Sequence, residues 1–338
     1  MQTYDKPYKT IDQLLDLLET NHNLTITNQE SAKNILKFIP YYDLVNGYKE
    51  HFMNEEDKFE TGLTLDTLYW FHTFDRGFQN VLFEFSVIIE DYYKNLLSQV
   101  LAKHFGVGEK EYLALENYVQ RKGIIKREII LQELNNIVKH TNDNPTKYYK
   151  AKHNHIPPWI LLKNTSFSTS INIFVLLTRN AKNDLSKELL PIDVPADQKI
   201  PIIRYTLTLI RKFRNVIAHN LKFTTFSYSR YGNNLNQKAL RLLIPSSLLS
   251  DAELQKKDML YGIYGYIVLS LSLIPDLSTR LMLVNKLSEY IANRSLQTDK
   301  NLSQMWYLLG QKYFSVTNIP TNVIQRFTNY SHEQIKNI

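Results

Sequence analysis

The sequence predicts an all-α protein, and three observations support this fold class. The 338 residues include only 10 glycines and 11 prolines, which favours long helices over a strand-and-turn architecture. Hydrophobic residues make up 43% of the chain, enough for a substantial core and too many for a disordered protein. Apolar side chains recur at three- and four-residue steps, which is the spacing of amphipathic helices. The length suits one large domain or two modest ones.

Composition also narrows the class of protein. No cysteine occurs, so disulfides, thiolate metal sites and cysteine nucleophiles are excluded. The 40 basic residues exceed the 33 acidic ones and give a net charge of +7, which mildly favours a polyanionic partner. The N-terminus lacks the apolar core of a signal peptide, and no apolar stretch approaches the length of a membrane span. We therefore expect a cytoplasmic protein with no membrane partner.

Residues 1–62 predict a small N-terminal unit of two helices and a short third one. Thr27 and Glu30 have the capping-box spacing that opens the second helix. Residues 54–62 are polar and are typical of a linker. The lysines of this unit either face nucleic acid or lie on a solvated helix face.

A long apolar run from Leu65 to about His104 predicts a largely buried helix. Charged residues interrupt this run at the following positions: Asp75, Arg76, Glu84, Glu90 and Asp91. Buried charges need partners, so Asp75 or Glu90 is predicted to act as an orienting carboxylate. Its partner would be Arg211 or Arg214. The alternative is a row of surface ion pairs along the helix.

Residues 141–158 predict a polar loop that carries histidines and lysines. His153 and His155 have a spacing that can bind a metal, but no carboxylate or thiolate lies near them in the sequence. No metal site is therefore predicted. A basic loop over a phosphate substrate is one interpretation, and a loop without a role is the other.

Residues 204–220 combine an apolar stripe with the richest set of reactive side chains in the sequence. The apolar residues recur at helical spacing: Leu207, Ile210, Phe213 and Ile217. The same stepping defines a second, polar stripe: Arg204, Thr208, Arg211, Asn215 and His219. One face of this helix is expected to pack on the core while the other presents arginines, an amide and an imidazole.

The reactive side chains point to RNA chemistry, with Arg214, Asn215 and His219 as candidate catalytic residues. A histidine exchanges a proton near neutral pH, and an arginine grips phosphate with a planar fork. Such a pair can cleave RNA without a metal or cofactor: the base deprotonates the ribose 2′-OH, and the arginine stabilises charge on the phosphate. Asn215 would orient the histidine, and Arg204 and Arg211 would bind RNA. The alternative role of basic residues at a helix end is to complement the helix dipole.

The spacing of this pair is a geometric problem. Residues five apart on an ideal helix point about 140° away from each other. Either the helix ends or bends near His219, or Arg214 reaches around its own backbone. A further solution is that two copies each contribute an arginine and a histidine to one cleft, and we favour such a homodimer.

After the central helix, the pattern predicts an antiparallel β-hairpin over residues 223–244. Two β-prone runs flank turn residues 231–234. Arg230, Tyr231 and Lys238 would give the hairpin the aromatic and basic groups that single-stranded RNA binders use. Tyrosines packed on the helices are the alternative. The chain is thus divided into three segments: residues 1–62, a helical core over 63–222, and 223–338 with the hairpin and C-terminal helices packed on that core.

Four segments together resemble the abortive-infection (Abi) proteins of bacteria, of the AbiD/AbiF type in the HEPN superfamily of RNases. The segments are Ile39–Tyr48, Phe74–Arg76, Pro157–Ile160 with Thr165–Phe167, and Arg214–Asn220. They occur in the family's order over roughly residues 7–222. The residues Asn220-Leu221-Lys222 depart from the His-x-Arg-Leu-like continuation of many members, so the resemblance assigns no substrate contacts after the histidine.

The resemblance implies an all-helical HEPN core and a metal-independent endoribonuclease that acts as a dimer. The family's motif corresponds to Arg214, the polar Asn215 and His219. The resemblance also implies phage defence by growth arrest, with a toxin-like nuclease held inactive by a regulatory small RNA or an antitoxin. The alternative is a non-catalytic RNA-binding HEPN protein that is controlled by a partner RNA or scaffolds it. A helical scaffold with a basic face is a third possibility.

Overall fold

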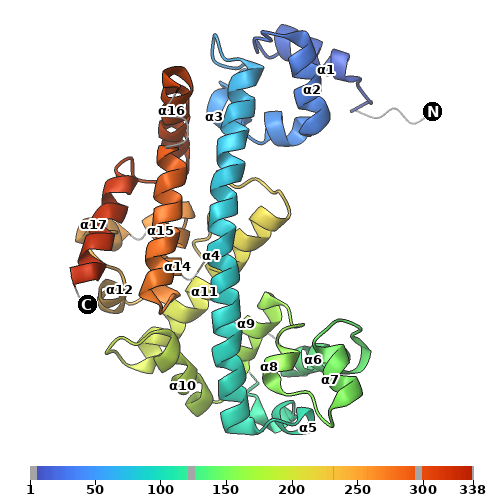
Figure 1. The fold of residues 1–338 in the computed structure, drawn as a ribbon, viewed down its shortest axis with the longest axis vertical. Helices are drawn as coiled ribbons and strands as arrows, with labels where there is room; N and C mark the ends of the chain where they lie inside the picture. Colours follow the sequence, from blue (N-terminus) through green and yellow to red (C-terminus); the bar gives the residue numbers. More distant parts are fainter. Residues whose placement is uncertain (1–5, 121–125, 231, 257, 294–298, 337–338) are drawn as a thin grey trace. The chain divides into compact units, whose positions relative to one another are not determined.

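Figure 1 shows the computed structural model of the chain, which describes residues 6–120, 126–230, 232–256, 258–293 and 299–336. These residues are predominantly helical. Among them, β pairing is confined to isolated bridges that join Thr25 with Thr64, Met53 with Phe59, and Tyr118 with Leu177. The prediction of an all-α protein is therefore confirmed.

The first helices in chain order are α1 (Ile11–Thr20), α2 (Gln29–Phe38), a π-helical turn η1 (Tyr42–Asn46), α3 (Lys49–Phe52), α4 (Leu65–Phe105), α5 (Glu109–Tyr112), η2 (Leu115–Asn117), α6 (Arg127–His140), α7 (Thr146–Lys152), α8 (Pro158–Leu161), α9 (Phe167–Leu176) and α10 (Arg179–Leu189). The later ones are α11 (Ala196–Ala218), η3 (Gly232–Asn234), α12 (Gln237–Leu243), α13 (Asp251–Lys256), η4 (Asp258–Leu260), α14 (Ile263–Leu273), α15 (Leu277–Ala292), α16 (Lys300–Thr317) and α17 (Val323–Lys336).

The described residues form two compact units, each assembled from segments far apart in the sequence. Unit 1 takes Met1–Val81, Val216–Phe226 and Lys286–Val323, and unit 2 takes Leu82–Asn215, Ser227–Asn285 and Ile324–Ile338. Helices α4 and α11 each contribute to both units. The predicted division at residues 62 and 222 follows the sequence rather than these contacts and stays a prediction.

Helix α4 is the long helix coloured from blue to teal in Figure 1 and spans 41 residues. It agrees with the predicted Leu65 to His104 to within one residue. Apolar side chains at a helical repeat, including the fully buried Leu68, Phe71 and Leu82, explain why so long a helix is stable.

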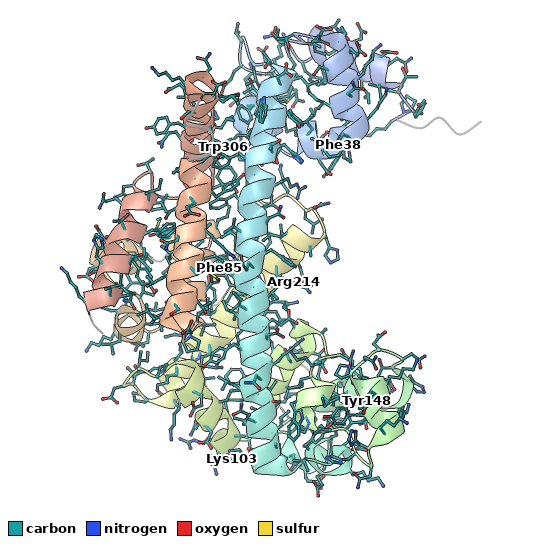
Figure 2. All side chains as sticks on the ribbon, viewed as in Figure 1. Phe38, Phe85, Lys103, Tyr148, Arg214 and Trp306 are labelled. Carbon is teal, nitrogen blue, oxygen red and sulfur yellow. The ribbon has the colours of Figure 1, made fainter. Side chains whose placement is uncertain are left out.

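Unit 1 has an aromatic core between α4 and α16. The Phe74 ring lies 4.9 Å from the Trp306 ring and 5.2 Å from the Tyr313 ring, centroid to centroid. Figure 2 labels Trp306 on α16. Gly77 leaves room for the Tyr290 ring beside this core, because a Cβ atom there would lie 2.2 Å from the Tyr290 hydroxyl oxygen.

Unit 2 has its core around α14, which is buried on every side because it is apolar almost throughout. The Tyr266 ring of α14 lies 5.1 Å from the Phe213 ring of α11. The Tyr266 hydroxyl lies 2.6 Å from the Ser86 hydroxyl of α4. The apolar side of α11 therefore packs on α14, and α14 in turn contacts α4, within this unit.

The predicted β-hairpin over residues 223–244 is wrong. The described residues of this stretch contain no strand, and α12 covers Gln237–Leu243. The Asn236 side chain caps α12 by accepting a hydrogen bond from the Ala239 amide at 2.9 Å. This cap favours a helix in an apolar run that is too short for its periodicity to separate helix from strand.

The predicted loop over residues 141–158 is partly helical, since α7 occupies Thr146–Lys152. The Asn164 side-chain oxygen accepts hydrogen bonds from the Thr146 amide and hydroxyl, at 3.4 and 2.7 Å. These bonds hold the first residue of α7. Their partners are 18 positions apart, so the local sequence pattern did not reveal them.

Candidate active site at the end of helix α11

Helix α11 has the two faces that its sequence predicts. Leu207, Ile210 and Phe213 are fully buried on its apolar side. The polar stripe is accessible: Arg204, Thr208, Arg211 and Asn215 are half-buried, and His219 is exposed. The amphipathic prediction for this helix is therefore confirmed.

The helix ends at Ala218, directly before His219. Asn220 adopts the left-handed conformation with φ 53°, which asparagine tolerates better than most residues. The Asn220 amide donates to the Ile217 carbonyl at 3.2 Å, and the Leu221 amide donates to the Val216 carbonyl at 2.9 Å. This pair of bonds is a Schellman motif, which closes a helix C-terminus. Of the geometric solutions considered for the motif, the ending of the helix near His219 is confirmed.

Arg214, labelled in Figure 2, lies one turn before the end of α11. The residue is half-buried. Its guanidinium lies over the Phe83 ring, 5.9 Å from the ring centroid. One terminal nitrogen donates to the Asn215 side-chain oxygen at 3.2 Å. Asn215, which was predicted to orient His219, thus contacts Arg214 through this oxygen. The Arg214 Nε atom is buried and has no hydrogen-bond partner among the described residues. The guanidinium is thus oriented by the protein. Its terminal nitrogens carry further N–H groups that can donate to an anion, whereas the buried Nε atom cannot reach one.

Asp75 lies in the core of unit 1 and is only 3% exposed. Its carboxylate accepts hydrogen bonds from the Tyr48 and Tyr313 hydroxyls, each at 2.8 Å. Burial raises the pKa of Asp75, and hydrogen bonds from Gln79 and the two tyrosines oppose that rise. The carboxylate predicted to pair with an arginine of α11 is therefore held by hydroxyl groups.

His72 lies beside this carboxylate cluster. Its Nδ1 atom is 3.1 Å from the Tyr48 hydroxyl oxygen. Because the Tyr48 proton goes to Asp75, we assign a proton to Nδ1, which then donates to Tyr48. Burial, followed by the nearby Arg76 charge, lowers the pKa of His72 to about 4.

Glu90, the second predicted orienting carboxylate, pairs with a lysine. The Lys94 Nζ atom lies 2.6 Å from the Glu90 carboxylate and donates at the same distance to the Thr165 carbonyl. Lys94 is 8% exposed. This cluster fixes the Thr165 segment to α4 and differs from the predicted pairing with Arg211 or Arg214.

Arg76 makes a contact that sequence reasoning missed. Its Nη1 atom donates to the Asn220 side-chain oxygen at 3.0 Å and to the Gln79 side-chain oxygen at 3.2 Å. Both Arg76 and Asn220 lie in segments of the family resemblance, which was a usable signal. The two residues are 144 positions apart, so no local pattern could join them.

The predicted RNA-binding residues are only partly tested by the structure. Arg230 and Lys238 are exposed, and Arg204 and Arg211 are half-buried. Tyr231 lies outside the described residues. The four described side chains are distributed over α11, the segment before η3 and α12 rather than gathered on one element. Their role in RNA binding stays a prediction.

Residues 139–163 form a basic surface apart from helix α11. This stretch holds five lysines and one aspartate. Tyr148 and Trp159 are 54% and 45% exposed. A pocket of 310 Å³ lies here, lined in part by Lys139, Lys150, His153 and His155. Within the described residues, no group of three or more histidine, cysteine or acidic side chains is arranged to hold a metal ion.

The fold and this helix end define an all-α protein with an accessible histidine at the C-terminus of a basic helix. The family model for Abi-like proteins matches residues 34–224. Because this match covers more than half of the chain, the protein belongs to the Abi-like protein family, an abortive-infection family. No curated protein and no solved structure matches the chain. Across the described residues, no helix is both long enough and apolar enough to span a membrane.

Proposed function

We propose that this protein is a metal-independent endoribonuclease that acts in phage defence by abortive infection. Family membership supports the defence role. The nuclease assignment rests on Arg214 and His219, whose spacing resembles that of HEPN RNases. A toxin-like activity of this kind would act in the cytoplasm and would be restrained by a small RNA or an antitoxin.

In the proposed reaction, the His219 imidazole takes the proton of a ribose 2′-OH. The 2′ oxygen then attacks the adjacent phosphorus, and the bond from phosphorus to the 5′ oxygen breaks. The leaving oxygen takes a proton from an imidazolium group. The products carry a 2′,3′-cyclic phosphate and a 5′-OH, and Arg214 stabilises the charge on the phosphate during attack.

One observation carries this proposal: the termination of α11 at Ala218. It leaves His219 exposed just outside the helix, about one turn after the half-buried Arg214, whose terminal nitrogens can donate to a phosphate.

The test is cleavage of total RNA by the purified protein, with and without EDTA, followed by mapping of the cut ends. We expect cleavage in both conditions and cyclic phosphate ends. His219→Ala should lower the rate by about 10²-fold or more, and Arg214→Ala by a similar factor. His332→Ala, which removes an exposed histidine of α17, is the matched control. Cleavage that persists in His219→Ala would contradict the role of His219. Cleavage that EDTA abolishes would contradict a metal-independent mechanism.

A homodimer is part of the proposal, with each copy contributing an arginine and a histidine to one cleft. Mixing inactive Arg214→Ala with inactive His219→Ala should restore about a quarter of the activity, because half of the dimers are mixed and each holds one intact pair. No restoration after subunit exchange would place both residues of each working pair in the same copy.

A non-catalytic RNA-binding protein is the second candidate, and the basic surface of residues 139–163 favours it. Exposed aromatic rings stack on bases, and lysines neutralise phosphates. Affinity for single-stranded RNA should then fall steeply with added salt. Binding without any cleavage by the unaltered protein, and unchanged in His219→Ala, would select this candidate.

A further inference from the structure

We propose that Arg76 is a positioning residue for His219 and acts through Asn220. This inference rests on the proposed function of His219. In physical terms, a side chain of α4 fixes the turn that contains His219.

The Arg76 guanidinium is itself held in place. Its Nη1 atom donates to Gln79, whose side chain is 1% exposed, as well as to Asn220. Gln79 in turn hydrogen bonds to the Asp75 carboxylate. Asp75 is fixed by two tyrosine hydroxyls. A chain of buried polar contacts therefore restricts the position of the Arg76 side chain.

Asn220 has two separate roles in the turn. Its backbone adopts the left-handed conformation that the Schellman motif requires. Its side-chain oxygen accepts the bond from Arg76 at 3.0 Å. Glycine would keep the first role and lose the second, whereas aspartate would keep both.

Side-chain contacts also fix residues 222–224, which follow the turn. Lys222 lies 2.6 Å from the Glu50 carboxylate, the His51 ring lies 2.8 Å from the Thr224 hydroxyl, and Phe223 is 2% exposed. The Lys222 and Glu50 side chains are 33% and 54% exposed, and the Arg76 to Asn220 bond is also exposed, so water weakens both interactions. Among these described contacts, the Arg76 bond lies closest in sequence to His219.

A general base must be held close to its productive position, because a displacement of about 1 Å can cost about 10²-fold in rate. Loss of the Arg76 bond should loosen the turn without removing any group that touches RNA. The loss should appear mainly in kcat, with little change in KM.

The experiment compares Arg76→Ala, Asn220→Gly and Asn220→Asp with the unaltered protein. Arg76→Ala and Asn220→Gly should each lower kcat by about fivefold, because an exposed charged hydrogen bond contributes less than a buried one. Asn220→Asp should stay within about threefold of the unaltered protein, because a carboxylate keeps the acceptor. The double variant should lose no more than either single one. Arg179→Ala removes an exposed arginine of α10 and is the control for charge.

Amide hydrogen exchange provides a readout that does not need cleavage. Exchange at Asn220 and Leu221 should be about fivefold faster in Arg76→Ala and unchanged in Asn220→Asp and the control. If the unaltered protein does not cleave RNA, the nuclease proposal fails, and unchanged exchange would separately refute the Arg76 contact. Faster exchange with normal cleavage would overturn the positioning role.

Discussion

Helix α4 carries two buried polar clusters of different kinds. In unit 1, the Asp75 carboxylate is held by neutral hydroxyls at 2.8 Å. In unit 2, Glu90 forms an ion pair with Lys94 at 2.6 Å. Both clusters fix a distant family segment to the same helix, through Tyr48 in the first case and Thr165 in the second.

Because one cluster is an ion pair and the other a hydroxyl-bound carboxylate, we expect the loss of one partner to destabilise them to different degrees. In the ion pair, removal of one partner leaves a charge with little solvent, which is costly. In the hydroxyl cluster, the carboxylate keeps a second donor when one tyrosine hydroxyl is lost. The predictions below separate these two behaviours.

The largest effect is expected for Lys94→Met, which leaves the Glu90 carboxylate and the Thr165 carbonyl without this donor. We expect the free energy of unfolding to fall by about 3 kcal/mol in denaturant titrations. Lys163→Met is the control, because the Lys163 to Asp91 pair is 55% and 63% exposed and should matter little. Equal losses of unfolding free energy in the two variants would contradict the distinction between the buried and the exposed ion pair.

A smaller effect should appear as pH dependence from His72. Its pKa is lowered to about 4 in the fold, so its stabilisation is present above the unfolded pKa near 6.5 and is lost as pH falls toward 4. Between about pH 7 and 4.5 the loss should be about 2 kcal/mol. The raised pKa of Asp75 acts in the opposite direction, since its contribution is lost as pH rises. His72→Asn should flatten the fall measured by thermal unfolding at each pH; an unchanged slope would contradict this.

The smallest effect is expected for Tyr313→Phe, which removes one of the two hydroxyl donors to Asp75. The free energy of unfolding should fall by about 1 kcal/mol. Tyr307→Phe on the same helix is the control, because Tyr307 is 59% exposed. A loss as large as that of Lys94→Met would mean that the hydroxyl cluster behaves like the ion pair.

Long periodic elements were predictable from the sequence, and long-range contacts were not. The repeat of apolar residues located α4 and the two faces of α11. The run after α11 was misassigned because it is short, and the Asn236 cap decided its structure. Arg214 and His219 are close in sequence and were found there, whereas the bond from Arg76 to Asn220 depends on the tertiary fold.

The aromatic packing of α16 on α4 has a consequence for the limits of this protein's folding unit. The family match ends at residue 224, yet Trp306 and Tyr313 close the core around Phe74. A chain cut at residue 224 would expose that ring to water and leave Asp75 with one tyrosine fewer. The boundary of the shared family sequence is therefore not a boundary at which this protein can be divided.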